Sequence, residues 1–145
     1  MNVDYENPWL YKDTTFTSDD IGDFFGYVYL ITNNKNGRQY IGRKYFWQFR
    51  TPKGKKRKVK SESDWKKYYG SCPELKEEIK QSGKQNFSRV ILSLHYTKGK
   101  TNYEETRQLF NHKVLTEQLD DGTPKYYNSN ILSRYFRKDY YGTES

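Results

Sequence analysis

The chain has 145 residues and a formal net charge of +8, from 26 Lys and Arg residues against 18 Asp and Glu residues. This length predicts one compact domain, because domains cluster near ~100–150 residues. A single cysteine, Cys72, excludes an intrachain disulfide and a cysteine-based zinc site. No apolar run approaches the ~20 residues of a membrane span, and the first residues lack a signal-peptide pattern. We therefore expect a cytoplasmic protein with no membrane partner.

The first 25 residues are acidic and rich in turn-forming residues, and we expect them to form an N-terminal arm. Four aromatic side chains would pack this arm against the protein: Trp9, Phe16, Phe24 and Phe25. Aromatic residues make up 18% of the chain, whereas all hydrophobic residues together make up only 33%. Each buried aromatic side chain removes ~150–250 Å² from water, so we expect a modest core rich in tyrosine.

The stretch GYVYLITNNKNGRQYIG, residues 26–42, predicts a β-hairpin. Two β-like runs, 27–32 and 39–42, flank a turn rich in Asn and Gly, which tolerate positive φ. The hairpin places tyrosines on facing strands. In a chain with 15 tyrosines, a cross-strand aromatic pair is the simplest interpretation of this placement.

The positive charge is concentrated directly after this hairpin. Nine basic residues and no acidic residue occur between positions 43 and 60: Arg43, Lys44, Arg50, Lys53, Lys55, Lys56, Arg57, Lys58 and Lys60. Without these nine, 17 basic residues stand against 18 acidic ones, so the basicity is local. A local basic cluster indicates a polyanionic partner, although a solvated loop is the alternative. Residues 51–60 have no apolar period and are interpreted as a basic loop.

The next segments predict a helix and a strand. A helix should begin near Pro73 and stop at Gly83, with Leu75 and Ile79 on one face. The run FSRVILSLHY, residues 87–96, is rich in β-forming residues and predicts a largely buried strand.

A second helix is predicted from Thr101, because Tyr103, Phe110 and Val114 recur on one helical face. A basic, aromatic C-terminal tail follows over residues 125–142, with its local structure left open. The order β-β-α-β-α predicts an α/β (α+β) fold. In this fold, helices would flank a small three-stranded, mainly antiparallel sheet.

The triplets Tyr27-Val28-Tyr29 and Tyr40-Ile41-Gly42 resemble the paired motifs of the GIY-YIG nuclease superfamily. The first triplet departs from the motif, with Tyr27 where glycine is usual, whereas the second matches fully. Arg50 lies eight residues after Gly42, where the family carries a catalytic arginine on its first helix. The segments SDWKKYYGSCPELKEEIKQSGKQNF and YYNSNIL are similar to the Seg-type (SegE-like) free-standing homing endonucleases of phages.

This resemblance implies a metal-dependent DNA endonuclease that hydrolyses phosphodiester bonds, with residues 26–145 as a GIY-YIG catalytic domain. The implied partners are double-stranded DNA and one divalent ion, Mg²⁺ or Mn²⁺. The family carries a metal-binding glutamate on a helix after the third strand, where this chain has Glu104 and Glu105. A helix directs neighbouring residues about 100° apart. Thr101 and Glu104 fit the spacing of a capping box, which leaves Glu105 as the expected ligand.

The resemblance also implies roles for the other site residues. Tyr40 is assigned as the general base and Tyr29 as its partner, although these two roles can be exchanged. Arg50 would bind the scissile phosphate and Arg43 would support it, and with Lys44 they would favour the phenolate form of the base. The expected DNA-binding residues are Lys44, Lys53, Lys55, Lys56, Arg57, Lys58, Lys60 and Asn128.

One position after the arginine departs from the family. Relatives often carry His or Tyr four residues past it, whereas this chain has Gly54, and Tyr68 or Tyr69 would have to substitute. The competing hypothesis is a nucleic-acid-binding module of the same fold with little or no cleavage. The sequence leaves the DNA target, nicking versus double-strand cleavage, and homodimer formation open.

Overall fold

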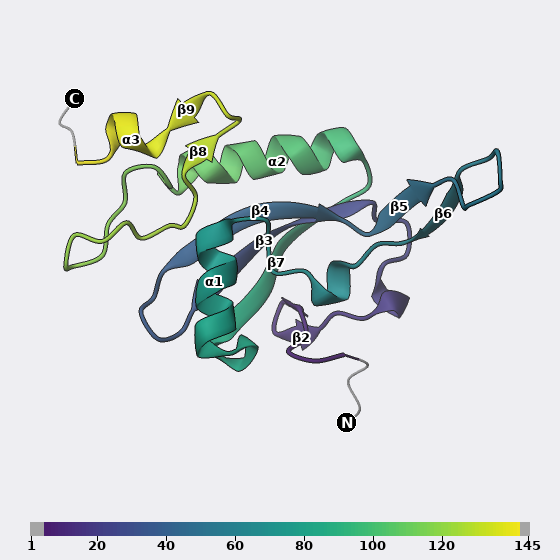
Figure 1. The fold of residues 1–145 in the computed structure, drawn as a ribbon, viewed down its shortest axis with the longest axis horizontal. Helices are drawn as coiled ribbons and strands as arrows, with labels where there is room; N and C mark the ends of the chain where they lie inside the picture. The colour runs from purple at the N-terminus through teal and green to yellow at the C-terminus, as the bar shows by residue number, and fades with distance from the viewer. Residues whose placement is uncertain (1–4, 143–145) are drawn as a thin grey trace.

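The computed structural model describes residues 5–142, so residues 1–4 of the expected arm and 143–145 of the expected catalytic domain lie outside the description. The centre of the fold is a five-stranded sheet in the order β2-β1-β7-β3-β4 (Figure 1). Its strands are β1 Leu10–Tyr11, β2 Thr14–Thr15, β3 Gly26–Asn33, β4 Gln39–Tyr45 and β7 Phe87–His95. The predicted mainly antiparallel sheet with flanking helices is confirmed, but the predicted number of three strands is wrong.

The three predicted strands form the middle and one edge of this sheet. Strand β3 pairs antiparallel with β4, with Tyr29 opposite Gly42 and Ile31 opposite Tyr40. Strand β3 also pairs antiparallel with β7 on its other side. The turn between β3 and β4 uses Gly37 with a φ of 79°, which a side chain would disfavour. The Asn/Gly-rich stretch therefore forms the predicted hairpin.

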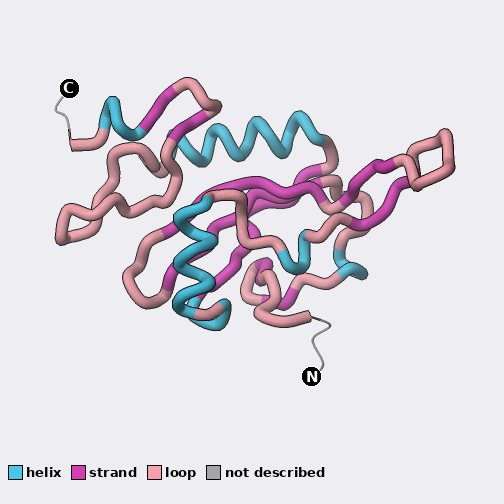
Figure 2. Tube along the Cα trace, in the orientation of Figure 1, coloured by secondary structure: helices cyan, strands magenta, loops and turns pink. Residues whose placement is uncertain are grey.

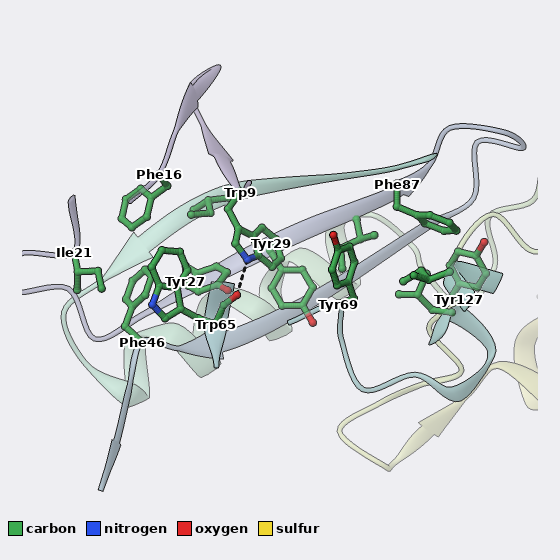
Figure 3. Close-up of a cluster of buried hydrophobic side chains, with 14 residues drawn as sticks. Trp9, Phe16, Ile21, Tyr27, Tyr29, Phe46, Trp65, Tyr69, Phe87 and Tyr127 are labelled. Carbon is green, nitrogen blue, oxygen red and sulfur yellow. Dashed lines mark hydrogen bonds between the residues drawn. The ribbon is translucent and has the colours of Figure 1, made fainter. Parts of the chain in front are cut away.

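The two additional strands come from the N-terminal segment. Strand β1 runs parallel to β7, with Leu10 opposite Val90, and pairs antiparallel with β2. Trp9 is fully buried and donates from Nε1 to the Trp65 carbonyl at 2.7 Å (Figure 3). Phe16 is also buried. Residues 5–25 thus share the sheet and the core of the rest of the protein.

The sheet separates two layers. Helix α1, Pro73–Ser82, and the N-terminal segment lie on one face, and helix α2, Lys98–Asn111, lies on the other (Figure 1). The core on the α1 face is rich in aromatic rings, as predicted, and includes Tyr27 and Tyr29 (Figure 3). The core on the α2 face is smaller and more aliphatic. Three single-turn 3₁₀ helices complete the first layer: Ser18–Asp20, Trp65–Lys67 and Lys84–Asn86.

Helix α1 matches its predicted bounds, with Cys72 before Pro73 and Gly83 after the last turn at a φ of 92°. Helix α2 begins earlier than predicted, because the Thr97 hydroxyl accepts the Lys100 backbone N–H and caps the helix there. Thr101 lies inside the helix, where its hydroxyl donates to the Thr97 carbonyl at 2.8 Å. The predicted capping box of Thr101 and Glu104 is therefore wrong.

The expected basic loop is the outer part of a two-stranded β-ribbon. Strand β5, Trp47–Arg50, pairs antiparallel with β6, Val59–Glu62. This β5–β6 ribbon projects from one end of the molecule, and a short loop closes its tip (Figure 2). Arg50 therefore ends a strand and does not lie on the first helix, as its spacing from Gly42 had suggested.

The C-terminal tail is also ordered. It contains a short hairpin of β8, Asn130–Ile131, and β9, Tyr135–Phe136, followed by helix α3, Arg137–Tyr140. Ile131 is buried in the core beneath α2. Within residues 5–142, no helix combines the length and apolar character needed to cross a bilayer.

Candidate active site

A cavity of about 450 Å³ opens at the free edge of β4. Its walls come from four parts of the chain: Tyr40 and Arg43 of β4, Glu105 of α2, the start of α1, and residues 127–133. Tyr40 and Arg43 are three positions apart and point to opposite faces of the sheet. Both reach the same cavity because β4 is an edge strand, around which the cavity wraps.

The segment after α2 covers part of this edge. The backbone N–H of Gln39 donates to the Lys125 carbonyl at 2.8 Å, and the N–H of Tyr127 donates to the Gln39 carbonyl at 2.7 Å. The Asn128 side chain continues the pattern: its Oδ1 accepts the Ile41 N–H at 3.1 Å and its Nδ2 donates to the Ile41 carbonyl at 2.9 Å. Asn128, expected to bind DNA, is therefore a buried clamp on the edge of β4.

Glu105 lies at the cavity with a side-chain exposure of 21%. Its Oε1 is 3.6 Å from Nε of Arg43, which also hydrogen-bonds to the Asn102 side chain. Burial raises the pKa of the Glu105 carboxyl, and the Arg43 charge acts against this rise. The expected ligand and the expected phosphate-supporting arginine thus face one another.

Glu104 points away from this cavity and has other partners. Its carboxylate accepts two hydrogen bonds from Arg107, at 2.8 and 2.6 Å, and one from Gln108 at 2.7 Å. The bonds from Arg107 hold the pKa of Glu104 below its ordinary value. The choice of Glu105 over Glu104 agrees with this geometry, although the capping argument that supported it does not.

The two motif tyrosines differ in access to the cavity. Tyr40 lines it, whereas Tyr29 is 1% exposed and packs behind it with 6.2 Å between the ring centroids. Burial raises the pKa of Tyr40 to about 12. Burial also raises the pKa of Tyr29 well above its ordinary value, and a hydrogen bond with Tyr68 adds to this rise. The expectation that nearby cations would favour phenolate is therefore wrong for the free protein.

Two glycines keep space for these phenols. A Cβ on Gly42 would overlap the Tyr29 hydroxyl, which explains glycine at the end of the second motif. A Cβ on Gly70 would lie 3.1 Å from Cε2 of Tyr40 and 3.3 Å from the Tyr29 hydroxyl. Gly70 also has a φ of 87°, a conformation that favours glycine. The loop at residues 68–71 thus packs directly on both tyrosines.

A second cleft of about 760 Å³ adjoins the first, because Arg43 lines both. Lys44 and Arg50 line this cleft with Asp64, and Lys44 Nζ lies 2.6 Å from Asp64 Oδ1. The hydrogen bond from Lys44 lowers the pKa of Asp64, and Arg50 contributes in the same direction. Arg50 does not line the cavity of Tyr40 and Glu105, so the structure separates these expected partners.

The remaining expected DNA-binding residues lie on the β5–β6 ribbon or its tip and are all exposed: Lys53, Lys55, Lys56, Arg57, Lys58 and Lys60. Only Lys60 has a described ring contact, with its Nζ 4.4 Å from the Trp47 ring centroid.

Sequence reasoning did not find two supporting residues. Tyr68, considered only as a substitute, contacts Tyr29 edge to face and lies beneath Lys44 Nζ at 4.1 Å. Arg89 is buried and donates to the carbonyls of Tyr68 at 2.8 Å and Asn7 at 2.5 Å. An arginine inside the apolar run 87–96 was the available signal, because a buried cation needs specific acceptors.

A known protein family matches most of this chain. Residues 9–131 match the family model SegE_GIY-YIG, described as "Putative endonuclease segE, GIY-YIG domain". The chain belongs to this GIY-YIG endonuclease family. No curated protein and no solved structure gives a significant match. The GIY-YIG assignment implies a nuclease and hence a nucleic acid substrate, and the matched residues include both tyrosine motifs and Glu105.

The residues that line the cavity at the edge of β4 fit a hard divalent cation such as Mg²⁺. Among residues 5–142, no group of three or more His, Cys, Asp or Glu side chains could enclose a metal. Mg²⁺ does not need such a group, because it keeps several waters and often takes one or two carboxylates plus substrate oxygens. Glu105 offers one carboxylate at a polar cavity, so it suits a metal shared with a phosphate.

Proposed function

We propose that this GIY-YIG protein is a metal-dependent DNA endonuclease of a phage or mobile element, of the homing type. The observation that carries the proposal is the meeting of Glu105, Arg43 and Tyr40 at one cavity beside a cationic cleft. The negative charge of a carboxylate that faces a phosphate would repel the DNA and weaken simple binding. A cation held between the two groups would turn this repulsion into attraction.

Glu105 would hold one Mg²⁺ or Mn²⁺ ion. When bound, such an ion supplies an acidified water and screens the charge that develops on the phosphate. The Nε–H of Arg43 donates to the Asn102 side chain, and the two terminal NH2 groups of the guanidinium would bind the phosphate oxygens. Arg43 rather than Arg50 therefore takes the role of the phosphate-binding arginine at the reacting centre.

Tyr40 would orient the attacking water. Its pKa of about 12 means that the hydroxyl is a neutral phenol near pH 7, able to donate one hydrogen bond and accept others. Tyr29 supports Tyr40 from behind, since its own hydroxyl is buried against Gly42. These positions favour a water-handling role for Tyr40 and a positioning role for Tyr29.

The basic residues along the second cleft would hold the DNA backbone. Lys44 lies beside Arg43, and the lysines of the ribbon tip extend the positive charge outward. Such contacts give affinity that depends on salt and little on sequence.

A DNA-binding module without cleavage is the second candidate function. It is favoured by one observation: helix α1, with the sequence PELKEEIKQS, carries no arginine. In the family resemblance, the first helix supplies the catalytic arginine, so its loss would be consistent with weakened chemistry.

Cleavage of supercoiled plasmid DNA with Mg²⁺ or Mn²⁺ tests the proposal. Wild type should nick or linearise the plasmid, and Glu105→Gln should lower the rate by at least ~10²-fold, as expected when a metal site is lost. Glu104→Gln is the matched control, with the same chemical change one residue away, and should retain most activity. DNA binding by all three proteins with no cutting by any would instead support the binding module.

A further inference from the structure

The β5–β6 ribbon has two faces with distinct chemistry. Side chains alternate along a strand, and cross-strand partners share a face. Gln48 and Arg50 therefore lie on one face with their partners Ser61 and Val59. Gln48 and Arg50, with Trp47 and Glu62 of the other face, also line the cleft that contains Arg43. The ribbon is therefore continuous with the approach to the candidate active site.

The tip of the ribbon is an exposed turn whose charged side chains are all basic. Residues 51–58 include five cations and no carboxylate: Lys53, Lys55, Lys56, Arg57 and Lys58. The Lys55 N–H donates to the Pro52 carbonyl at 3.0 Å, and Gly54 adopts a φ of 80°, so the tip contains a defined turn. Five cations gathered on one turn repel one another and are neutralised best by a polyanion.

The ribbon also exposes apolar side chains on both faces. Phe49 is 49% exposed on one face, and Val59 is 50% exposed on the other. Two isolated strands gain little stability on their own, because they have no core to bury. A partner that covers the face of Gln48 and Arg50 would bury Val59 with them.

The dimensions of the ribbon match one groove of DNA. Two paired strands lie ~4.8 Å apart, so with side chains the ribbon is about 10 Å wide, and four residues extend ~13 Å. The major groove of B-DNA is ~12 Å wide and ~8.5 Å deep, whereas the minor groove is only ~6 Å wide. A two-stranded ribbon fits the first groove as it stands, whereas the second would have to be widened to admit it.

We propose that the β5–β6 ribbon inserts into the major groove of duplex DNA beside the scissile phosphate. This inference rests on the proposed nuclease function and specifies how the substrate is held. The tip cations bind phosphates on the groove walls, and Gln48 and Arg50 face the base edges. Arg pairs with guanine and Gln with adenine through two hydrogen bonds each, so this face biases which sequences are cut.

The first test compares two triple variants with the same loss of charge. The tip variant replaces Lys55, Lys56 and Lys58 by Gln. The control variant replaces the exposed residues Lys35, Lys76 and Lys80 by Gln. Binding to a 30-base-pair duplex is measured without divalent metal over a range of salt. The tip variant should lower the slope of log affinity against log salt by roughly 2–3, whereas the control should change it by less than about 1. Equal slopes for both variants overturn the proposal.

The second test identifies the groove. Methyl green, which occupies the major groove, should displace the wild-type protein from an A·T-rich duplex, whereas netropsin in the minor groove should not. The opposite result overturns the proposal. Both binding tests omit the metal, so they remain decisive even if the protein never cuts DNA.

The third test addresses base reading. Binding selection from a random-sequence duplex pool should enrich guanine at a fixed position with wild type. This enrichment should disappear in Arg50→Ala and persist in the tip variant. The same guanine enrichment with Arg50→Ala would exclude base contact by Arg50 and overturn this part of the proposal.

Discussion

Nε of Arg43 lies 3.6 Å from Oε1 of Glu105, and these two residues connect the edge strand β4 with helix α2 across the mouth of the cavity. At this distance the two charges attract one another but do not form a close ion pair. Each group can therefore still bind another partner. A phosphate can approach the guanidinium while a cation approaches the carboxylate.

Substitution of Arg43 should affect the chemical step. Arg43→Ala should lower the single-turnover cleavage rate at saturating DNA by ~10²-fold, as for loss of a preorganised charge at a reacting phosphate. Arg43→Lys should recover only part of the lost cleavage rate, because an ammonium group lacks the planar pair of donors with which arginine binds two phosphate oxygens. Arg50→Ala should mainly raise the Kd for DNA. A larger rate loss for Arg50→Ala than for Arg43→Ala would return the catalytic role to Arg50.

Removal of single hydroxyls should separate the two motif tyrosines. Tyr40→Phe should reduce cleavage by ~10²-fold or more with unchanged folding, because it removes the phenol at the cavity. Tyr29→Phe should lower the free energy of unfolding by about 1 kcal/mol through its bond with Tyr68, with a smaller effect on cleavage. Urea unfolding and single-turnover rates on both variants make the comparison.

Gly70→Ala should disturb stability and cleavage together. The new methyl group must accept a φ of 87° and lie 3.1 Å from the Tyr40 ring. We expect a loss of about 1–3 kcal/mol, with Tyr40 displaced from the cavity. Gly37→Ala is a useful control, since Gly37 has a φ of 79° but no atom within 4 Å of the added methyl. Equal cleavage by the two variants would show that the Gly70 contact does not position Tyr40.

Asn128→Ala should release the segment after α2 from the edge of β4. It leaves the buried N–H and carbonyl of Ile41 without their side-chain partners, at a cost of roughly 1–3 kcal/mol for each unsatisfied group. Hydrogen exchange at the Ile41 amide should accelerate. Unchanged exchange with weaker DNA binding would instead support the DNA-contacting role first expected for Asn128.

Because burial raises the pKa of Tyr40, we expect the free energy of unfolding to decrease at alkaline pH. Unfolded tyrosines titrate near pH ~10, whereas the pKa of Tyr40 in the folded protein is about 12. Between these values the folded state holds a proton that the unfolded state has released. The contribution of Tyr40 to the free energy of unfolding is therefore fully present below pH ~10 and is lost as pH rises. Tyr40 alone lowers the free energy of unfolding by up to ~1.4 kcal/mol per pH unit in this window. Urea unfolding at pH 9, 10 and 11 should show a shallower decline for Tyr40→Phe; an identical decline would contradict the burial of this phenol.

The sequence predicted elements whose signals are local. The Asn/Gly turn between β3 and β4, and Pro73 and Gly83 at the ends of α1, each act within a few residues. The N-terminal strands escaped prediction because β1 and β2 have two residues each and exist through pairing with β7. No local pattern reports such a distant partner.

Arg50 shows how a spacing can mislead. Counting eight residues from Gly42 assumes a helix, but the stretch Trp47-Gln48-Phe49-Arg50 alternates aromatic and polar residues, which is the period of a strand. The local pattern was therefore the better guide. Glu105 and Tyr40, predicted as catalytic residues, both line the cavity, whereas the raised pKa of Tyr40 depends on three-dimensional burial that the sequence does not display.

The parallel pairing of β1 with β7 also determines when the protein can fold during synthesis. Leu10 pairs with Val90, so β1 leaves the ribosome about 80 residues before the partner strand with which it pairs. At ~5–20 residues per second, this delay is roughly 4–16 s. Until then Trp9 has no core to enter, because Trp65 and β7 close around it. The nascent chain therefore depends on protection of its aromatic N-terminal segment, and conditions that slow translation should increase its aggregation.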